Sequence, residues 1–399
     1  MIYPANFEEK IGFDRIREQV TALCSTPSAK AKLAEEGFST SADEIERRLS
    51  LMNEMRSLLM LERDFPDGDY PDPAPLVAKI RVEGSYLLAA EADQLRKALV
   101  TVGAIAEFIL GRGGARYPRL WELSRRVTLF PEIVRAIDAI LDDRGEVKDS
   151  ASPELQQVRR AIREREGQAA KRLQQVLQRA KQAGIVDADA VLSVRDGRPV
   201  IPVAAANKRK LQGFIHDESA TGRTFYVEPV EVVEINNELK ELEYAERREV
   251  VKVLSAFTES IRPDAEVIAD AGDYLSSVDM IRAKARWALA NDAGKPILST
   301  DDRLELRTAR HPLLQQTLRA QGREVVPLDL ALDRRKHILV ISGPNAGGKS
   351  VCLKTTGLMQ YLFQCGYPVP ASEVSELPVF RSIFIDIGDE QSIDDDLST

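Results

Sequence analysis

A glycine-rich run followed by lysine and serine holds the residues of this sequence that are best suited to chemistry. The run reads GPNAGGKS and has the spacing G-x-x-x-x-G-K-[ST]. Its glycines let backbone N–H groups turn toward phosphate oxygens, and a following helix adds the positive end of its dipole. Lys349 would reach the β and γ phosphates of a nucleotide, and Ser350 would ligate Mg²⁺. We therefore expect a site for ATP and Mg²⁺ that consists of Gly343, Pro344, Asn345, Ala346, Gly347, Gly348, Lys349, Ser350 and Val351.

The residues on either side of this run predict the elements that would position it. The apolar stretch Ile338 to Ile341 predicts a strand that leads into the loop. The stretch Val351 to Gln364 predicts a helix that follows it. Because strand, loop and helix occur in the order that the motif requires, we interpret the run as a phosphate-binding loop.

Composition limits the other possibilities. A chain of 399 residues with 44% hydrophobic residues can bury a core and is expected to form two or three domains. Its start, MIYPANFEEK, has no signal-peptide pattern and no apolar run reaches about 18 residues, so we expect a cytoplasmic protein without membrane contact. Three cysteines, Cys24, Cys352 and Cys365, fit neither a disulfide framework nor a zinc site. A net charge of −8 confines any nucleic-acid contact to a local basic patch.

The first 145 residues predict a helical scaffold. Ser41 and Glu44 form a capping-box pattern, and Ile45, Leu49 and Met52 follow at helical spacing. Such a stripe directs one face of a helix into a core, so this region carries structure rather than chemistry.

From Pro153 the pattern predicts a long helix with a seam. Leu155, Ile162, Ala169 and Val176 recur at every seventh position, and such a seam needs a partner helix. A matching stripe begins near Asn236 and continues through Leu239, Leu242, Val250, Val253 and Phe257. The two stretches predict an antiparallel arm.

The segment between these helices predicts a small β module at the end of the arm. Residues 187–232 contain β-branched and aromatic runs, interrupted by hairpin signals at Asp196-Gly197 and Thr221-Gly222. His216 has no second ligand nearby, so it is expected to be a hydrogen-bonded structural histidine. Cations on or beside the turns could bind phosphates, or they could be solvated loop charges. These candidate nucleic-acid-binding residues are Arg195, Arg198, Lys208, Arg209, Lys210 and Arg223.

Several motifs together carry a resemblance to a known family. GPNAGGKS, with ARHPLL (309–314) before it and GYPVPASE (366–373) after it, resembles the MutS branch of the ABC-type ATPases. The stretches IFIDIGDEQSIDDDLST (383–399) and GFIHDESATGRTFYVEPVEVVEINNEL (213–239) are similar to the second bacterial MutS paralogue. The resemblance covers essentially the whole chain. Because no room precedes Gly343 for mismatch-reading and connector domains, mismatch recognition is disfavoured.

The resemblance implies a mixed, mainly α fold that contains the beginning of an α/β P-loop ATPase domain. The implied parts are a helical core (1–152), a lever helix (153–186), a β-rich clamp (187–232), a return lever helix (233–262), core helices (263–300) and the N-terminal part of the ATPase domain (301–399).

The resemblance also implies a nucleotide site that two subunits share. In such a homodimer, Ser398 would act on the nucleotide of the partner subunit, together with Lys349 and Ser350 as the catalytic residues. Asn345 would face the partner. Val325 or Val326 would form part of an apolar lid over the adenine.

The end of the sequence imitates a catalytic strand. Ile383 to Ile385 followed by Asp386 looks like a Walker B strand, and Asp389 and Glu390 offer a carboxylate pair. We interpret both as decoys, because a Walker B aspartate is followed directly by the glutamate that orients water, whereas Asp386 precedes Ile387. The true Walker B strand, the switch histidine and a nuclease domain are expected beyond Thr399. The chain is therefore expected to be truncated within its ATPase domain and inactive in hydrolysis.

Three functions remain open. The first is an ATP-dependent clamp on branched or distorted nucleic acid in the control of DNA recombination. The second is an ATP-driven rescue factor that binds ribosomal RNA and splits stalled or collided ribosomes, since phosphate contacts do not distinguish DNA from RNA. The third is a structural dimer that nucleotide fastens together. A small-molecule kinase is disfavoured because it would not need a long arm.

Overall fold

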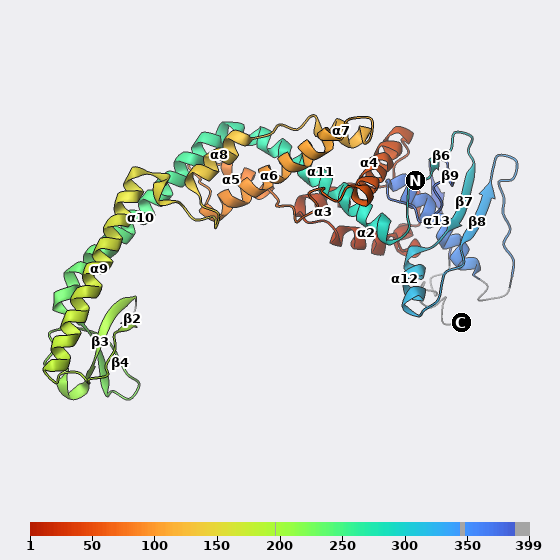
Figure 1. The fold of residues 1–399 in the computed structure, drawn as a ribbon. Helices are drawn as coiled ribbons and strands as arrows, with labels where there is room; N and C mark the ends of the chain where they lie inside the picture. Colours follow the sequence, from red (N-terminus) through yellow and green to blue (C-terminus); the bar gives the residue numbers. More distant parts are fainter. Residues whose placement is uncertain (196, 344–347, 388–399) are drawn as a thin grey trace. The chain divides into compact units, whose positions relative to one another are not determined.

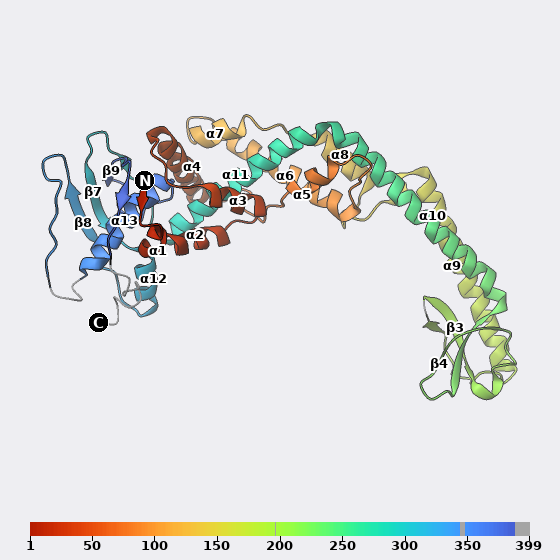
Figure 2. The same cartoon turned by 180° about the vertical axis from the view of Figure 1, so that it is seen from behind.

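The computed structural model describes residues 1–195, 197–343 and 348–387. The chain divides into two compact units, each assembled from separate stretches of sequence (Figures 1 and 2). Unit 1 contains Met1–Ala78, Gln94–Val134 and Asp264–Thr399, and unit 2 contains Lys79–Asp93 and Arg135–Pro263. In the described part of the chain, no helix combines the length and the apolarity needed to cross a membrane.

Helices make up most of unit 1, and the cap expected at Ser41 is present. The side chain of Ser41 accepts a hydrogen bond from the Glu44 backbone N–H, and Ile45, Leu49 and Met52 behind this cap are fully buried. The helices with all their residues in unit 1 are α1 (Phe7–Ile11), α2 (Phe13–Ala22), α3 (Pro27–Glu35), α4 (Ala42–Leu61), α7 (Pro118–Ser124), α11 (Ala265–Ala290), α12 (Pro312–Ala320) and α13 (Lys349–Cys365). Three α-helices have residues in both units: α5 (Ala74–Ile80), α6 (Ala89–Gly111) and α8 (Pro131–Ile140).

Two small sheets belong to unit 1. A four-stranded sheet has the order β6-β9-β7-β8 and combines parallel and antiparallel pairs. In a second sheet, β1 near the beginning of the chain pairs in parallel with β10. The strands are β1 (Ile2–Tyr3), β6 (Ile297–Leu298), β7 (Leu304–Ala309), β8 (Leu328–Leu332), β9 (Glu376–Leu377) and β10 (Ile383–Phe384).

The strand expected before the phosphate-binding loop is not formed. Residues 338–341 have no strand assignment, and Ile338 and Val340 are 76% and 84% exposed. A parallel strand needs neighbouring strands to bond its backbone and cover its faces. Within the described residues none pairs with this segment, so its apolar side chains face solvent. By contrast, the helix expected after the loop is present as α13.

The antiparallel arm expected from the seam forms the main part of unit 2. Helix α9 (Pro153–Gln182) lies beside α10 (Val230–Ile261) in both views (Figures 1 and 2). Leu155, Ala169 and Val176 are buried as predicted, whereas Ile162 is half-buried. Helix α10 begins before the predicted Asn236, because the preceding strand runs directly into it and Pro229 occupies the N-cap position.

Four antiparallel strands lie where α9 ends and α10 begins (Figure 1). One side of this sheet packs on α9, with Ile201, Val203 and Val227 in a common apolar cluster with Leu173 and Val176. Arg195 pairs with Arg198, which leaves two residues for the predicted hairpin turn; Asp196 lies outside the described residues. The strands have the order β2-β3-β5-β4 and are β2 (Ser193–Arg195), β3 (Arg198–Ala204), β4 (Gly213–Glu218) and β5 (Thr224–Pro229).

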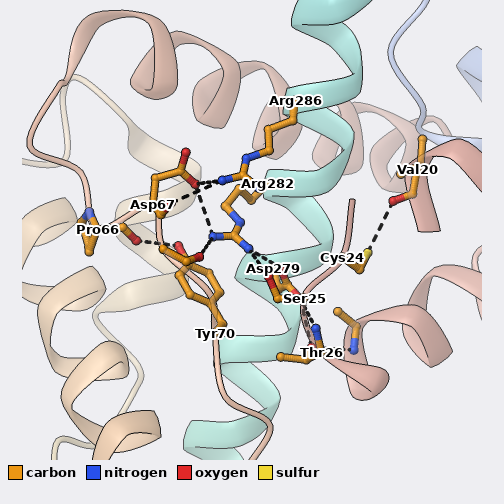
Figure 3. A network of polar contacts seen from close by, with 12 residues as sticks. Val20, Cys24, Ser25, Thr26, Pro66, Asp67, Tyr70, Asp279, Arg282 and Arg286 are labelled. Atoms are coloured by element: carbon orange, nitrogen blue, oxygen red, sulfur yellow. Dashed lines mark hydrogen bonds and ion pairs between the residues drawn. The ribbon is translucent and has the colours of Figure 1, made fainter. Parts of the chain in front are cut away.

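A buried network of charges holds α11 against the N-terminal helices of unit 1 (Figure 3). Arg282 and Asp279 are fully buried and lie 2.8 Å apart. Asp279 accepts hydrogen bonds from the backbone N–H and the hydroxyl of Thr26, which is the N-cap residue of α3. The Arg282 guanidinium also stacks on Tyr70, 3.7 Å from the ring centroid. The network therefore joins one helix to two distant segments of sequence.

Replacement of Arg282 by methionine should destabilise unit 1 by about 3–5 kcal/mol, because Asp279 would stay buried without its charged partner. Denaturant unfolding followed by circular dichroism measures this change. Arg286→Met is the matched control, since Arg286 binds Asp67 at a partly exposed position and should change the free energy of unfolding by about 0–1 kcal/mol. Equal effects of the two substitutions would show that the buried pair has no special role.

His311, the N-cap residue of α12, is a buried neutral base in unit 1. Burial is the main reason why the pKa of His311 is lowered to about 4; the Ile11 backbone acts against this shift, and the charges of Lys354 and Arg15 add to it. Above its ordinary pKa of about 6.5, the imidazole is neutral in both the folded and the unfolded state. As the pH falls below that value, the unfolded state binds a proton that the folded state does not, so stability decreases until the pH reaches about 4.

Between about pH 7.5 and pH 5, this difference in proton binding should cost about 2 kcal/mol of stability. His311→Gln should remove that part of the pH dependence, because glutamine has no titrating group. Denaturant titrations of both proteins at the two pH values measure it. If the loss of stability on acidification is the same in both proteins, His311 does not remain neutral in the folded state.

Candidate nucleotide and nucleic-acid sites

The predicted nucleotide residues gather at the beginning of α13. Gly348 is the N-cap residue in a left-handed conformation with φ of 80°, and Lys349 and Ser350 form the first turn. The Lys349 ammonium group donates a hydrogen bond to the Gly343 carbonyl oxygen over 2.6 Å. This contact brings the two ends of the glycine-rich loop together.

The far end of α13 is anchored inside unit 1. The Tyr361 hydroxyl donates to the Glu8 carboxylate over 2.6 Å. The Gln364 amide donates to the backbone oxygens of Ser39 and Phe380 over 2.9 and 2.8 Å. Because three separate segments hold the buried half of the helix, the position of its first turn within unit 1 is fixed.

The donor set at this turn fits a phosphate group and a magnesium ion. Backbone N–H groups at a helix N-terminus have no intrahelical acceptor, and they lie beside an ammonium group and a hydroxyl. Lys349 would hold phosphate oxygens, and Ser350 would hold the metal. The structure places Gly343, Gly348 and Val351 here as well, whereas Pro344, Asn345, Ala346 and Gly347 lie outside the described residues.

The remaining predicted nucleotide residues are spread more widely. Val326 is 87% exposed, whereas Val325 lines a polar cavity of about 180 Å³ with Arg310 and Glu324. Ser398 lies outside the described residues. How these residues meet a nucleotide therefore remains a prediction.

Asp386 follows β10 and faces a different cavity. This space of about 390 Å³ also has Leu353, Gly357 and Ile385 in its lining. Within the described residues, no group of three or more His, Cys, Asp or Glu side chains could hold a metal ion. Asp389 and Glu390 lie outside that part of the chain.

Two of the predicted nucleic-acid-binding residues have carboxylate partners in unit 2. Arg198 contacts the Glu228 carboxylate over 2.7 Å. Arg195 contacts Asp217 over 2.9 Å and covers the Tyr226 ring, with its guanidinium carbon 3.9 Å from the centroid. Both guanidinium groups therefore contribute to the structure of the sheet, and any phosphate must compete with these contacts.

Glu228 is the buried centre of this sheet and was not predicted. Its side chain is 1% exposed and accepts hydrogen bonds from Arg198, from His216 over 2.6 Å and from Asn236 over 2.6 Å. Burial alone would raise the pKa of Glu228, but the hydrogen bonds from Asn236, His216 and Arg198 outweigh it and lower the pKa. His216 is thus a structural histidine, as predicted. No local pattern marks Glu228, because its partners lie on β3, β4 and α10.

The other four predicted cations are exposed. Lys208, Arg209 and Lys210 lie on the loop 205–212, which we term the clamp loop. The Ala205 N–H donates to the Arg223 carbonyl over 2.9 Å, which brings Arg223 beside this loop. Lys208 lies over the Phe225 ring. Among the residues that the structure describes, Arg209, Lys210 and Arg223 form no ion pair, so the geometry leaves them accessible to phosphates.

Comparison with known proteins agrees with the motifs. Residues 339–399 match the family described as MutS domain V. The class of protein that the motifs and this match indicate is the MutS family, and the predicted resemblance to it is confirmed.

Within that family, the similarity is to proteins named endonuclease MutS2. The Bacillus velezensis protein is 34% identical over 389 residues, which cover 97% of this chain and 48% of that protein. The Thermomicrobium roseum protein is 36% identical over 400 residues, which cover 97% of this chain and 49% of that protein. The Bacillus subtilis protein, named a putative endonuclease MutS2, is 34% identical, with 97% and 48% covered. The chain spans about half the length of these curated relatives.

Proposed function

We propose that this chain is the nucleotide-binding and nucleic-acid-clamping part of a MutS-type ATPase that acts as a homodimer. Its target would be branched or distorted nucleic acid, in the control of DNA recombination. The observation that carries the proposal is the joint presence of a glycine-capped helix start at Gly348–Ser350, which is suited to phosphate, and a group of exposed cations at the end of a two-helix arm.

The arm has the properties of a stiff lever. Helix α9 has 30 residues, which corresponds to a length of about 45 Å. Arg159 bonds to Glu246 and Arg165 to Glu238 across the two helices, over 2.7 and 2.9 Å. Paired helices that also share an apolar seam resist bending. The clamp cations would therefore move together with the arm.

The same geometry also supports one other target and one other function, which the tests below separate. Ribosomal RNA offers the same phosphates as DNA, so a factor acting on stalled ribosomes would use the same cations. A structural dimer that nucleotide fastens together would need the nucleotide site but not the cations. The name endonuclease belongs to the relatives, and a nuclease activity of the whole protein remains a proposal.

Conversion of Lys208, Arg209 and Lys210 together to glutamate should weaken binding to a four-way DNA junction. Each lost phosphate contact should flatten the log-log salt dependence of binding by about 0.9. Fluorescence anisotropy over a range of salt concentrations measures both the affinity and this slope. Preferential loss of ribosome binding in co-sedimentation would favour the ribosomal target. An unchanged slope with an intact fold would contradict the clamp.

Lys349→Ala should abolish binding of ATP with Mg²⁺, because it removes the ammonium group that would contact the phosphates. A fluorescent ATP analogue titrated into the chain measures the dissociation constant. Lys336→Ala is the matched control, since this exposed lysine lies outside the glycine-rich loop. Nucleotide binding that survives Lys349→Ala but not Lys336→Ala would place the site elsewhere.

A further inference from the structure

Two long stretches of unit 2 contain cations but no carboxylate. Residues 167–186 and residues 197–216 have no Asp or Glu, although the whole chain has 63 acidic residues in 399, about one in six. The first stretch covers the second half of α9 and the turn after it, and the second contains the clamp loop. An acid-free surface is what a polyanion requires, because like charges at close range repel it.

These stretches are neighbours in the folded unit. The Asn207 side-chain amide donates to the Ile185 carbonyl oxygen over 3.0 Å. Leu211 of the clamp loop packs against the apolar cluster that includes Leu173 and Leu177 of α9. The clamp loop therefore lies against the end of α9, and the two acid-free stretches form one continuous region.

The solvent side of α9 carries donors along its second half. Ala169, Leu173, Val176 and Ala180 are buried, so residues on the opposite side of the helix face water. Exposed side chains on that half of the helix include Lys171, Arg172, Gln175, Gln178 and Arg179.

A role in helix capping explains part of this charge, but not all of it. Cations near a helix C-terminus interact favourably with its dipole, and this accounts for the last-turn residues Arg179 and Lys181. The effect falls off within one turn, whereas Lys171 and Arg172 lie well before the end of α9. Within the described residues, Lys171 and Arg172 form no ion pair. Arg179 is 60% exposed and lies 3.7 Å from its nearest carboxylate, Glu231.

Charge is divided between the two helices of the arm. The sequence of α9 contains eight Lys or Arg and three Glu, whereas α10 contains four Lys or Arg and eight Glu. Some of these cations and carboxylates pair with each other across the two helices. The remaining charges make α9 the more basic side of the arm and α10 the more acidic side.

We infer that the nucleic-acid-binding surface continues from the clamp loop along α9, through Lys171, Arg172 and Arg179. Its ligand is the phosphate backbone, which these side chains contact from the α9 side of the arm. The exposed glutamines add neutral hydrogen-bond donors between the cations. This inference rests on the proposed nucleic-acid clamp, and it extends the surface to residues of the arm.

The test uses the full 399-residue chain with a fluorescein-labelled four-way DNA junction. The helix variant is Lys171→Gln, Arg172→Gln and Arg179→Gln, since glutamine is a good helix former at exposed positions. The control variant is Lys240→Gln, Arg247→Gln and Arg248→Gln, which removes the same charge from exposed positions of α10. Circular dichroism checks the helix content of both. A variant with Lys171→Gln and Arg172→Gln alone keeps the contact of Arg179 with Glu231.

The helix variant should lose up to about 2.7 in the log-log salt slope, at about 0.9 for each contact. Its affinity at about 0.1 M salt should fall by between ~10-fold and ~100-fold, and the control variant should keep the original slope. If the helix variant keeps its slope while the Lys208, Arg209 and Lys210 variant loses it, the extension along α9 is wrong and the clamp stands. If neither variant changes the slope, the clamp itself is wrong. An equal loss in the α10 control would overturn the extension, because it would reflect net charge alone.

Discussion

Burial of the second half of α13 is the constraint on which unit 1 depends. Tyr361 packs against Phe7 and Phe13, with ring centroids 5.1 and 4.9 Å away, and its hydroxyl binds Glu8. Aromatic contacts of this kind combine a large buried apolar area with a preferred geometry. They bring the first helices of the chain against a helix that lies about 350 residues later. The partly exposed first turn of α13 can present Lys349 and Ser350 because the rest of the helix is held in this way.

Unit 2 is held together differently from unit 1, because a two-helix arm has only a narrow apolar core. An apolar seam and a set of ion pairs hold α9 beside α10, and the sheet packs its apolar side on α9 near the end of that helix. Glu228 then ties β3, β4 and α10 together through Arg198, His216 and Asn236. A buried carboxylate with three donors is satisfied, whereas the loss of any one donor would remove a hydrogen bond from a buried charge. The same contacts explain why Arg198 is a structural residue of the sheet.

Local patterns were a reliable guide where a residue's partners are close in sequence or where a motif has a fixed spacing. The Ser41 cap, the helix after the glycine-rich loop, the antiparallel arm and the structural role of His216 all follow from such patterns. The strand expected at Ile338 to Ile341 shows the limit of this reasoning. An apolar run indicates that a segment would be stable in a sheet, but a strand forms only beside neighbours that bond its backbone. Within the described residues, that segment has none.

By itself, the sequence determined the chemistry that is available: a glycine-rich loop followed by lysine and serine, a seam, hairpin turns and the cations between them. The tertiary structure decided which of these groups remain accessible. It paired Arg195 and Arg198 with carboxylates from other strands, and it left Arg209 and Lys210 exposed. It also joined β1 to β10 and buried Arg282 beside Asp279 and Tyr70. The physical reason is that burial and ion pairing depend on groups far apart along the chain, and only folding brings those groups within reach of one another.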